Sequence, residues 1–103
     1  MATPYQRGRS AEYRARRCFE ELGWLVIRSA GSKGPADICA LSQDGMVKLI
    51  QVKRGKAGLG TEERAALELL AAAYPYCTVE CWHWRGGQWE ITRFGEVRCQ
   101  KAT

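Results

Sequence analysis

The feature that most constrains the fold is an Asp-Gly dipeptide at positions 44–45, between two strand-forming segments, residues 36–41 and 47–54. Asp-Gly accepts the positive φ angles of the tight turns that join antiparallel strands. The two segments are therefore expected to form a hairpin. Pairing across this turn brings the start of the first strand close to the end of the second.

Three polar residues lie where these strand ends meet. Asp37 stands at the start of the first strand, and Gln51 and Lys53, two residues apart, share one face of the second. Carboxylate and amide oxygens bind hard divalent cations, and an ammonium group can orient and electrostatically favour an attacking hydroxide. Together the three residues predict metal-dependent hydrolysis of a phosphodiester.

Hydrophobic residues early in the chain recur with helical spacing. The stripe comprises Ala11, Ala15, Cys18, Phe19 and Leu22. This spacing predicts an amphipathic helix with Ser10 as its N-cap that ends at Gly23. Residues 24–29 are rich in strand formers, and a polar, glycine-rich loop follows them.

The second half of the chain predicts one more helix and two more strands. Residues 55–60 form a glycine-rich basic loop, and Thr61 followed by two glutamates predicts a helix that runs to about Tyr74. Residues 78–84 and 88–92 predict a second hairpin. This order of elements predicts an α/β or α+β domain with a mixed sheet flanked by helices.

The net charge of +5 is unevenly distributed along the 103 residues. Residues 1–60 carry eleven Lys and Arg against five Asp and Glu, whereas residues 61–103 carry five against six. Because nucleic acids are bound largely through neutralisation of their phosphates, this charge beside Asp37 favours a nucleic-acid substrate. A solvated charged face is the alternative interpretation of the charge alone.

The cysteines and the first residues indicate a cytoplasmic protein. Residues 1–17 lack the apolar core of a signal peptide, no window has the roughly 18 apolar residues that span a bilayer, and five is an odd number of cysteines for a disulfide framework. Reduced, structural thiols and no membrane contact are expected. Cys77, Cys81 and His83 lack the close Cys pair of common structural zinc sites.

Three motifs occur in order in the first half: Glu12 in the first predicted helix, a string from Arg28 to Ser32 continued by Gly34-Pro35-Ala36-Asp37-Ile38, and Gln51-Val52-Lys53. They resemble the PD-(D/E)XK nuclease fold and, more closely, the archaeal-type Holliday junction resolvases. The resemblance implies a restriction-endonuclease-like core with a mixed five-stranded sheet. It also implies a single nuclease domain over residues 1–103, with a core at about 7–94 and a tail at 95–103.

The resemblance further implies a homodimeric endonuclease that makes paired symmetric nicks across a four-way DNA junction with Mg²⁺, or Mn²⁺ in its place. Asp37 would be the central metal ligand, Glu12 would add a carboxylate, the backbone carbonyl of Val52 would face the metal, and Ser32 would contact a phosphate. Gln51 departs from the family pattern, because Glu or Asp is usual there. Its amide oxygen can coordinate a cation but brings no charge.

Basic residues that surround this site in sequence are the candidates for phosphate contacts. They are Arg7, Arg9, Arg14, Arg28, Lys33, Arg54 and Lys56. The glycine-rich stretch from Gly31 to Gly34 lacks the Lys-Ser/Thr ending of a P-loop, so no nucleotide cofactor is expected. Trp82, Trp84 and Trp89 alternate along strands and are expected in the core or in a subunit interface.

Three alternatives remain open from the sequence. A nuclease of the same fold could act on flaps, nicked or linear DNA. Gln51 in place of an acid could mark a junction-binding module with weakened or lost catalysis. A basic RNA-binding or structural protein is the third alternative, although the chain lacks an aromatic RNA-binding signature.

Overall fold

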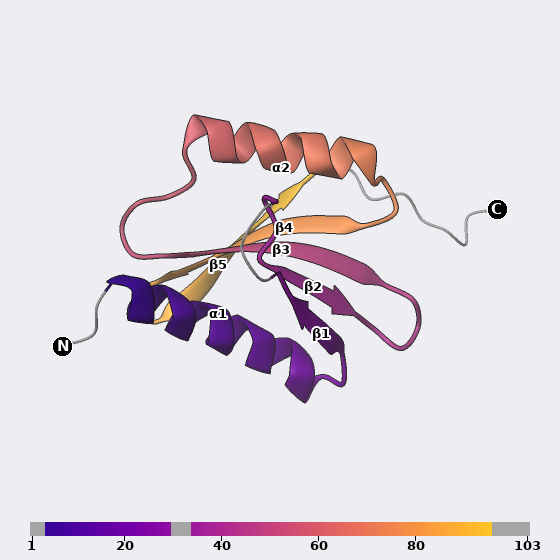
Figure 1. Ribbon diagram of the computed structural model, residues 1–103, viewed down its shortest axis with the longest axis horizontal. Helices are drawn as coiled ribbons and strands as arrows, with labels where there is room; N and C mark the ends of the chain where they lie inside the picture. The colour runs from indigo at the N-terminus through magenta and orange to yellow at the C-terminus, as the bar shows by residue number, and fades with distance from the viewer. Residues whose placement is uncertain (1–3, 30–33, 96–103) are drawn as a thin grey trace.

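The computed structural model describes residues 4–29 and 34–95, and the side chains from residue 10 onward within them. In these residues one helix and three strands are followed by a second helix and two more strands (Figure 1). Their order is α1 (Pro4–Glu21), β1 (Leu25–Arg28), β2 (Ile38–Leu41), β3 (Val47–Arg54), α2 (Thr61–Ala73), β4 (Thr78–Arg85) and β5 (Gln88–Phe94).

The five strands form one sheet in the order β1-β2-β3-β4-β5. Neighbouring strands pair antiparallel except β3 and β4, which are parallel and are connected through α2. A parallel pair requires such a crossover, because the chain must return to the same end of the sheet. The predicted mixed five-stranded sheet flanked by helices is confirmed.

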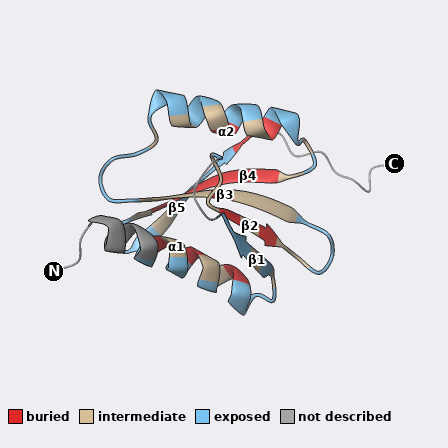
Figure 2. Ribbon diagram, in the orientation of Figure 1, coloured by how far each residue is buried: buried red, intermediate tan, exposed pale blue. Residues whose placement is uncertain are grey.

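The two helices cover opposite faces of the sheet (Figure 1). Because side chains alternate along a strand, Ile38, Ile50 and Trp82 pack with Phe19 of α1 on one face. On the other face a second cluster packs under α2, and it comprises Leu67, Ala71, Val79, Cys81 and Phe94. Figure 2 shows buried residues on the inner side of each helix and along the central strands.

Helix α1 and strand β5 both extend beyond their predicted bounds. Helix α1 begins at Pro4 and not after Ser10, which is consistent with the preference of proline for the first helical turn. Helix α2 begins at Thr61 as predicted, with Gly60 as its N-cap. Strand β5 continues to Phe94, beyond the predicted end at residue 92, because its last residue is buried under α2.

Candidate active site

The predicted hairpin places Asp37 beside β3. Gly45 in its turn has a φ of 95°, which glycine adopts without strain. The register pairs Ile38 with Ile50, and the Asp37 N–H donates to the Ile50 carbonyl at 2.7 Å. Asp37 is therefore fixed to β3 immediately before β2 begins, and it lines the same pocket as Gln51.

The carboxylate of Asp37 is fixed by a backbone group of β3. Its Oδ2 accepts a hydrogen bond from the Val52 N–H at 2.8 Å. Since the N–H and C=O of one strand residue point to the same edge, the Val52 carbonyl points to this edge as well. Both an acid and a backbone oxygen are thus directed to the start of β2.

Burial is the main reason that the pKa of Asp37 is raised above its ordinary value. The hydrogen bond from Val52 opposes this shift, the nearby Glu12 carboxylate adds to it, and the positive charges of Lys53 and Arg28 oppose it. Glu12 and Lys53, from the other two motifs noted in the sequence, are therefore close enough to Asp37 to act on its pKa.

Asp37 and Gln51 face α2, because Ile38 and Ile50, their neighbours in sequence, face α1. They line a shallow pocket of about 480 Å³ under the first turn of that helix. Its lining residues are Gly34, Pro35, Asp37, Gln51, Glu62, Glu63 and Ala66. Oxygen atoms of carboxylates and an amide dominate its polar groups.

Lys53 lies on the same face but is engaged by a residue of α2. Its Nζ donates to both carboxylate oxygens of Glu63, at 3.0 and 2.8 Å. The Lys53 and Glu63 side chains are 23% and 42% exposed, so this ion pair stands at the rim of the pocket. The strand holds Lys53 beside Gln51 as expected, and its ammonium group reaches toward the helix.

Sequence reasoning did not identify Glu63 as a site residue. Its position in the first helical turn suggested only an interaction with the helix dipole. In the structure it also accepts the Gly60 N–H at 3.0 Å, and the pKa of Glu63 is lowered chiefly by the hydrogen bond from Lys53 and then by the one from Gly60. The short connection over residues 55–60 could have indicated this contact, because so short a loop keeps the first turn of α2 near the end of β3.

Cys81 of β4 lies next to Gln51 on the same face of the sheet. It pairs with Gln51 in the β3–β4 register and is buried. Burial raises the pKa of the Cys81 thiol to about 11, and Lys53, Glu63 and Asp37 all act on it electrostatically. The charges of Asp37, Lys53 and Glu63 are therefore all close enough to this buried thiol to act on its pKa.

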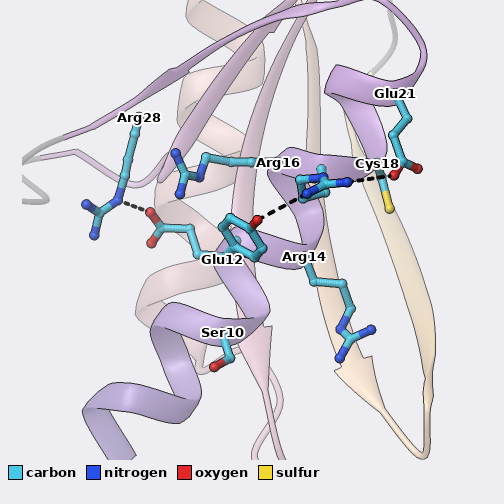
Figure 3. Close-up of a pocket in the computed structure, with 9 residues that line it drawn as sticks. Ser10, Glu12, Arg14, Arg16, Cys18, Glu21 and Arg28 are labelled. Carbon is cyan, nitrogen blue, oxygen red and sulfur yellow. Dashed lines mark hydrogen bonds and ion pairs between the residues drawn. The ribbon is translucent and has the colours of Figure 1, made fainter.

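Glu12 lies on the other side of the sheet edge. Its Oε1 accepts a hydrogen bond from Nε of Arg28, and both residues line a larger pocket of about 710 Å³ along α1 (Figure 3). Arg14, Arg16 and Arg17 also line it, so this pocket is basic. The sequence placed Glu12 with Asp37; the structure brings its charge near Asp37 but pairs it with an arginine.

The remaining candidates for DNA contacts are distributed over the described surface. The Arg14 guanidinium stacks over the Trp84 ring at 4.3 Å, whereas Arg54 and Lys56 are exposed at the end of β3. Ser32 and Lys33 lie outside the described residues, and Arg7 and Arg9 lie in α1 without a described side chain. Trp82 is buried in the core, and Trp89 packs between its ring and that of Trp84.

The donors in the Asp37 pocket fit a hard divalent cation. Asp37, Gln51 and the Val52 carbonyl offer only oxygen, and Mg²⁺ in proteins is held by one or two carboxylates together with substrate phosphates and water. In the part of the chain that the structure describes, no three His, Cys, Asp or Glu side chains form a group that could hold a metal ion by themselves.

No described helix is long and apolar enough to cross a membrane.

Comparison with known proteins identifies the fold. No family model and no curated protein sequence matches the chain. Among solved structures, the chain is similar to Hjc, a Holliday junction resolvase from the archaeal hyperthermophile Archaeoglobus fulgidus, with a TM-score of 0.62 and 23% sequence identity. The match covers 84% of this chain and 72% of that one. The fold expected from the sequence motifs, a mixed five-stranded sheet flanked by helices as in this resolvase, is thereby confirmed.

Proposed function

We propose that this protein is a metal-dependent, structure-selective DNA endonuclease that resolves four-way junctions. The observation that carries the proposal is the Asp37 carboxylate, held by the Val52 N–H beside Gln51 on a fold shared with a junction resolvase. The acid, the amide and the backbone carbonyl are fixed by strand pairing rather than by a loop. Such a constellation is rigid enough to position a scissile phosphate.

The proposed cofactor is Mg²⁺, with Mn²⁺ as a substitute, held by Asp37, Gln51 and the Val52 carbonyl and supported by Glu12. When bound, the ion neutralises developing charge on the phosphate oxygens and lowers the pKa of water. Lys53 would orient the attacking water from the same strand face. Ser32 would contact the scissile phosphate or its neighbour.

Phosphate contacts would come from the basic half of the chain. Arg54 and Lys56 are exposed beside Lys53, and Arg14 lies on α1 with its guanidinium fixed by Trp84. Arg7, Arg9, Arg28 and Lys33 complete the proposed set. A surface of this kind binds DNA through its backbone, so selectivity for a junction would come from shape.

A homodimer is the assembly that this function requires. A four-way junction has approximate two-fold symmetry, and an isologous dimer presents two equivalent active sites to it. Paired symmetric nicks then follow from geometry. Light scattering of the purified protein would give about twice the 11.6 kDa chain mass, whereas a monomer with full activity would contradict the dimer.

The test is nicking of an end-labelled four-way junction and of a matched linear duplex, with Mg²⁺ and with chelator. The proposal expects symmetric, Mg²⁺-dependent nicks in the junction, and a loss of at least about 100-fold in rate for Asp37→Asn because the central ligand loses its charge. The matched control is Asp44→Asn, which changes an exposed acid in the turn of the same hairpin. It should nick like the wild type.

Other outcomes would replace the proposal. Equal cleavage of linear duplex, nicked DNA or flaps would indicate a nuclease of the same fold with another substrate. Tight binding of the junction without nicks in either metal would indicate a binding module, which the neutral side chain at position 51 favours. Nicking activity that is unchanged by Asp37→Asn would show that the pocket of Asp37 is not the active site.

A further inference from the structure

Asp37, Gln51 and Lys53 together carry too little negative charge to attract a divalent cation. Among the partly buried groups, Asp37 contributes one negative charge, Lys53 one positive charge and Gln51 none, while Glu12 is already paired with Arg28. Glu62 also lines the pocket, but it is exposed, so water screens its charge. Without Glu63, the partly buried charges sum to zero. A divalent cation would therefore find donors in the pocket but no net attraction, and Coulomb interactions are large where burial lowers the dielectric constant.

Glu63 lies where it can supply the missing negative charge. It comes from the first turn of α2, lines the pocket together with Asp37 and Gln51, and contacts Lys53 through both of its oxygens. A carboxylate has about four acceptor positions, so the hydrogen bonds from Lys53 and from the Gly60 N–H leave it able to bind a further partner.

We infer that Glu63 is the second acid of the active site, supplying from α2 the negative charge that Gln51 does not supply from β3. The inference rests on the proposed function and deepens it. With Glu63 included, the site carries the net charge of −1 that an acid at position 51 would give. Glu63 also positions Lys53, since the ion pair holds the ammonium group between helix and strand.

A helix-capping role alone is the competing explanation. Glu63 is the third residue of α2 and accepts the N–H of the N-cap, Gly60. Glutamine performs this function at the same position, because its amide oxygen accepts the same hydrogen bond. Glu63→Gln therefore removes the charge while preserving the cap. A carboxylate placed at position 51 cannot replace the cap but can replace the charge.

The experiment measures Mn²⁺ binding to the full chain without DNA, by electron paramagnetic resonance of free Mn²⁺. Four proteins are compared: wild type, Glu63→Gln, Gln51→Glu, and the double variant. Glu63→Gln should bind Mn²⁺ about 10- to 100-fold more weakly. The double variant should recover most of this affinity. Glu68→Gln, an exposed acid farther along α2, is the matched control and should bind like wild type.

Nicking of the junction by the same four proteins provides the second readout. Loss in Glu63→Gln with recovery in the double variant supports the inference. Unchanged Mn²⁺ binding in Glu63→Gln, or no recovery by Gln51→Glu, overturns it. If the wild type binds Mn²⁺ and responds to Glu63→Gln but cleaves no DNA, the proposed nuclease activity fails while the role of Glu63 in the metal site stands.

Discussion

At the scale of single residues, the ionised side chain of Asp37 lowers the stability of the folded protein. The half-buried Asp37 carboxylate has a raised pKa, first because of burial. A raised pKa in the folded state means that this residue contributes most to stability below its unfolded pKa of about 3.9, and that the contribution is lost as the pH rises through the folded pKa. At neutral pH the ionised carboxylate therefore lowers stability.

Asp37→Asn should accordingly raise the free energy of unfolding at pH 7, and the gain should disappear at about pH 3, where both states of the wild type are protonated. Urea unfolding at the two pH values measures this. Asp44→Asn should change stability in the opposite direction, because the hydrogen bond from Ser42 lowers the pKa of Asp44. A loss of stability at pH 7 in Asp37→Asn would show that its hydrogen bond to Val52 outweighs burial.

At the scale of elements, one buried carboxylate connects β3, β4 and β5. It lies on the face of the sheet that α1 covers. Glu80 of β4 is 1% exposed and accepts hydrogen bonds from Lys48 of β3, Trp82 and Arg93 of β5. Burial acts to raise the pKa of Glu80, but the hydrogen bond from Trp82, the charge of Lys48 and the bond from Arg93 outweigh it, and the pKa is lowered. The network stabilises the central strands above the unfolded pKa of this group.

Glu80→Ala should lower the free energy of unfolding by about 3 kcal/mol, because two cations and an indole N–H lose their shared acceptor. Denaturant unfolding at pH 7 measures the change. The stabilisation should fade as the pH falls through the lowered pKa of Glu80. Glu90→Ala is the matched control on β5, where the carboxylate is exposed and 3.8 Å from Arg85. It should stay within about 0.5 kcal/mol of wild type.

At the scale of the whole molecule, most of the positive charge and the strands that hold Asp37, Gln51 and Lys53 come from the same half of the chain. Residues 1–60 supply the helix α1, the hairpin and eleven of the 16 basic residues. Binding of a polyanion by such a surface releases counterions, so affinity falls as salt rises. In the described residues, this charge gathers most clearly in the pocket along α1, which Arg14, Arg16, Arg17 and Arg28 line.

Arg54→Ala should reduce the salt dependence of junction binding, lowering the slope of log K against log salt by about one unit, because one phosphate contact is lost. Fluorescence anisotropy over a salt series measures the slope. Arg17→Ala is the control of the same residue type, since that guanidinium is already engaged by Tyr13 and Glu21 on α1. An equal effect of both variants would indicate non-specific charge rather than contacts beside the site.

The sequence by itself determined the features that depend on residues close together in the chain, which are the hairpin and the positions of the helices. The Asp-Gly turn fixed the β2–β3 register and with it the approach of Asp37 to Gln51 and Val52, because a tight turn leaves one pairing for the residues that follow. Helical periodicity located α1, and Thr61 followed by two glutamates located the start of α2. Boundaries such as the start of α1 at Pro4 were missed, since an amphipathic stripe does not show how far a helix extends beyond its buried face.

Only the tertiary structure decided which distant residues meet. The parallel pairing of β3 with β4 places α2 over the end of β3, and this brings Glu63 to Lys53 and into the pocket of Asp37. The same packing pairs Glu12 with Arg28 and buries Glu80. No local pattern encodes these contacts, because their formation depends on how whole elements bury their apolar faces, and polar side chains are carried to their partners as a consequence.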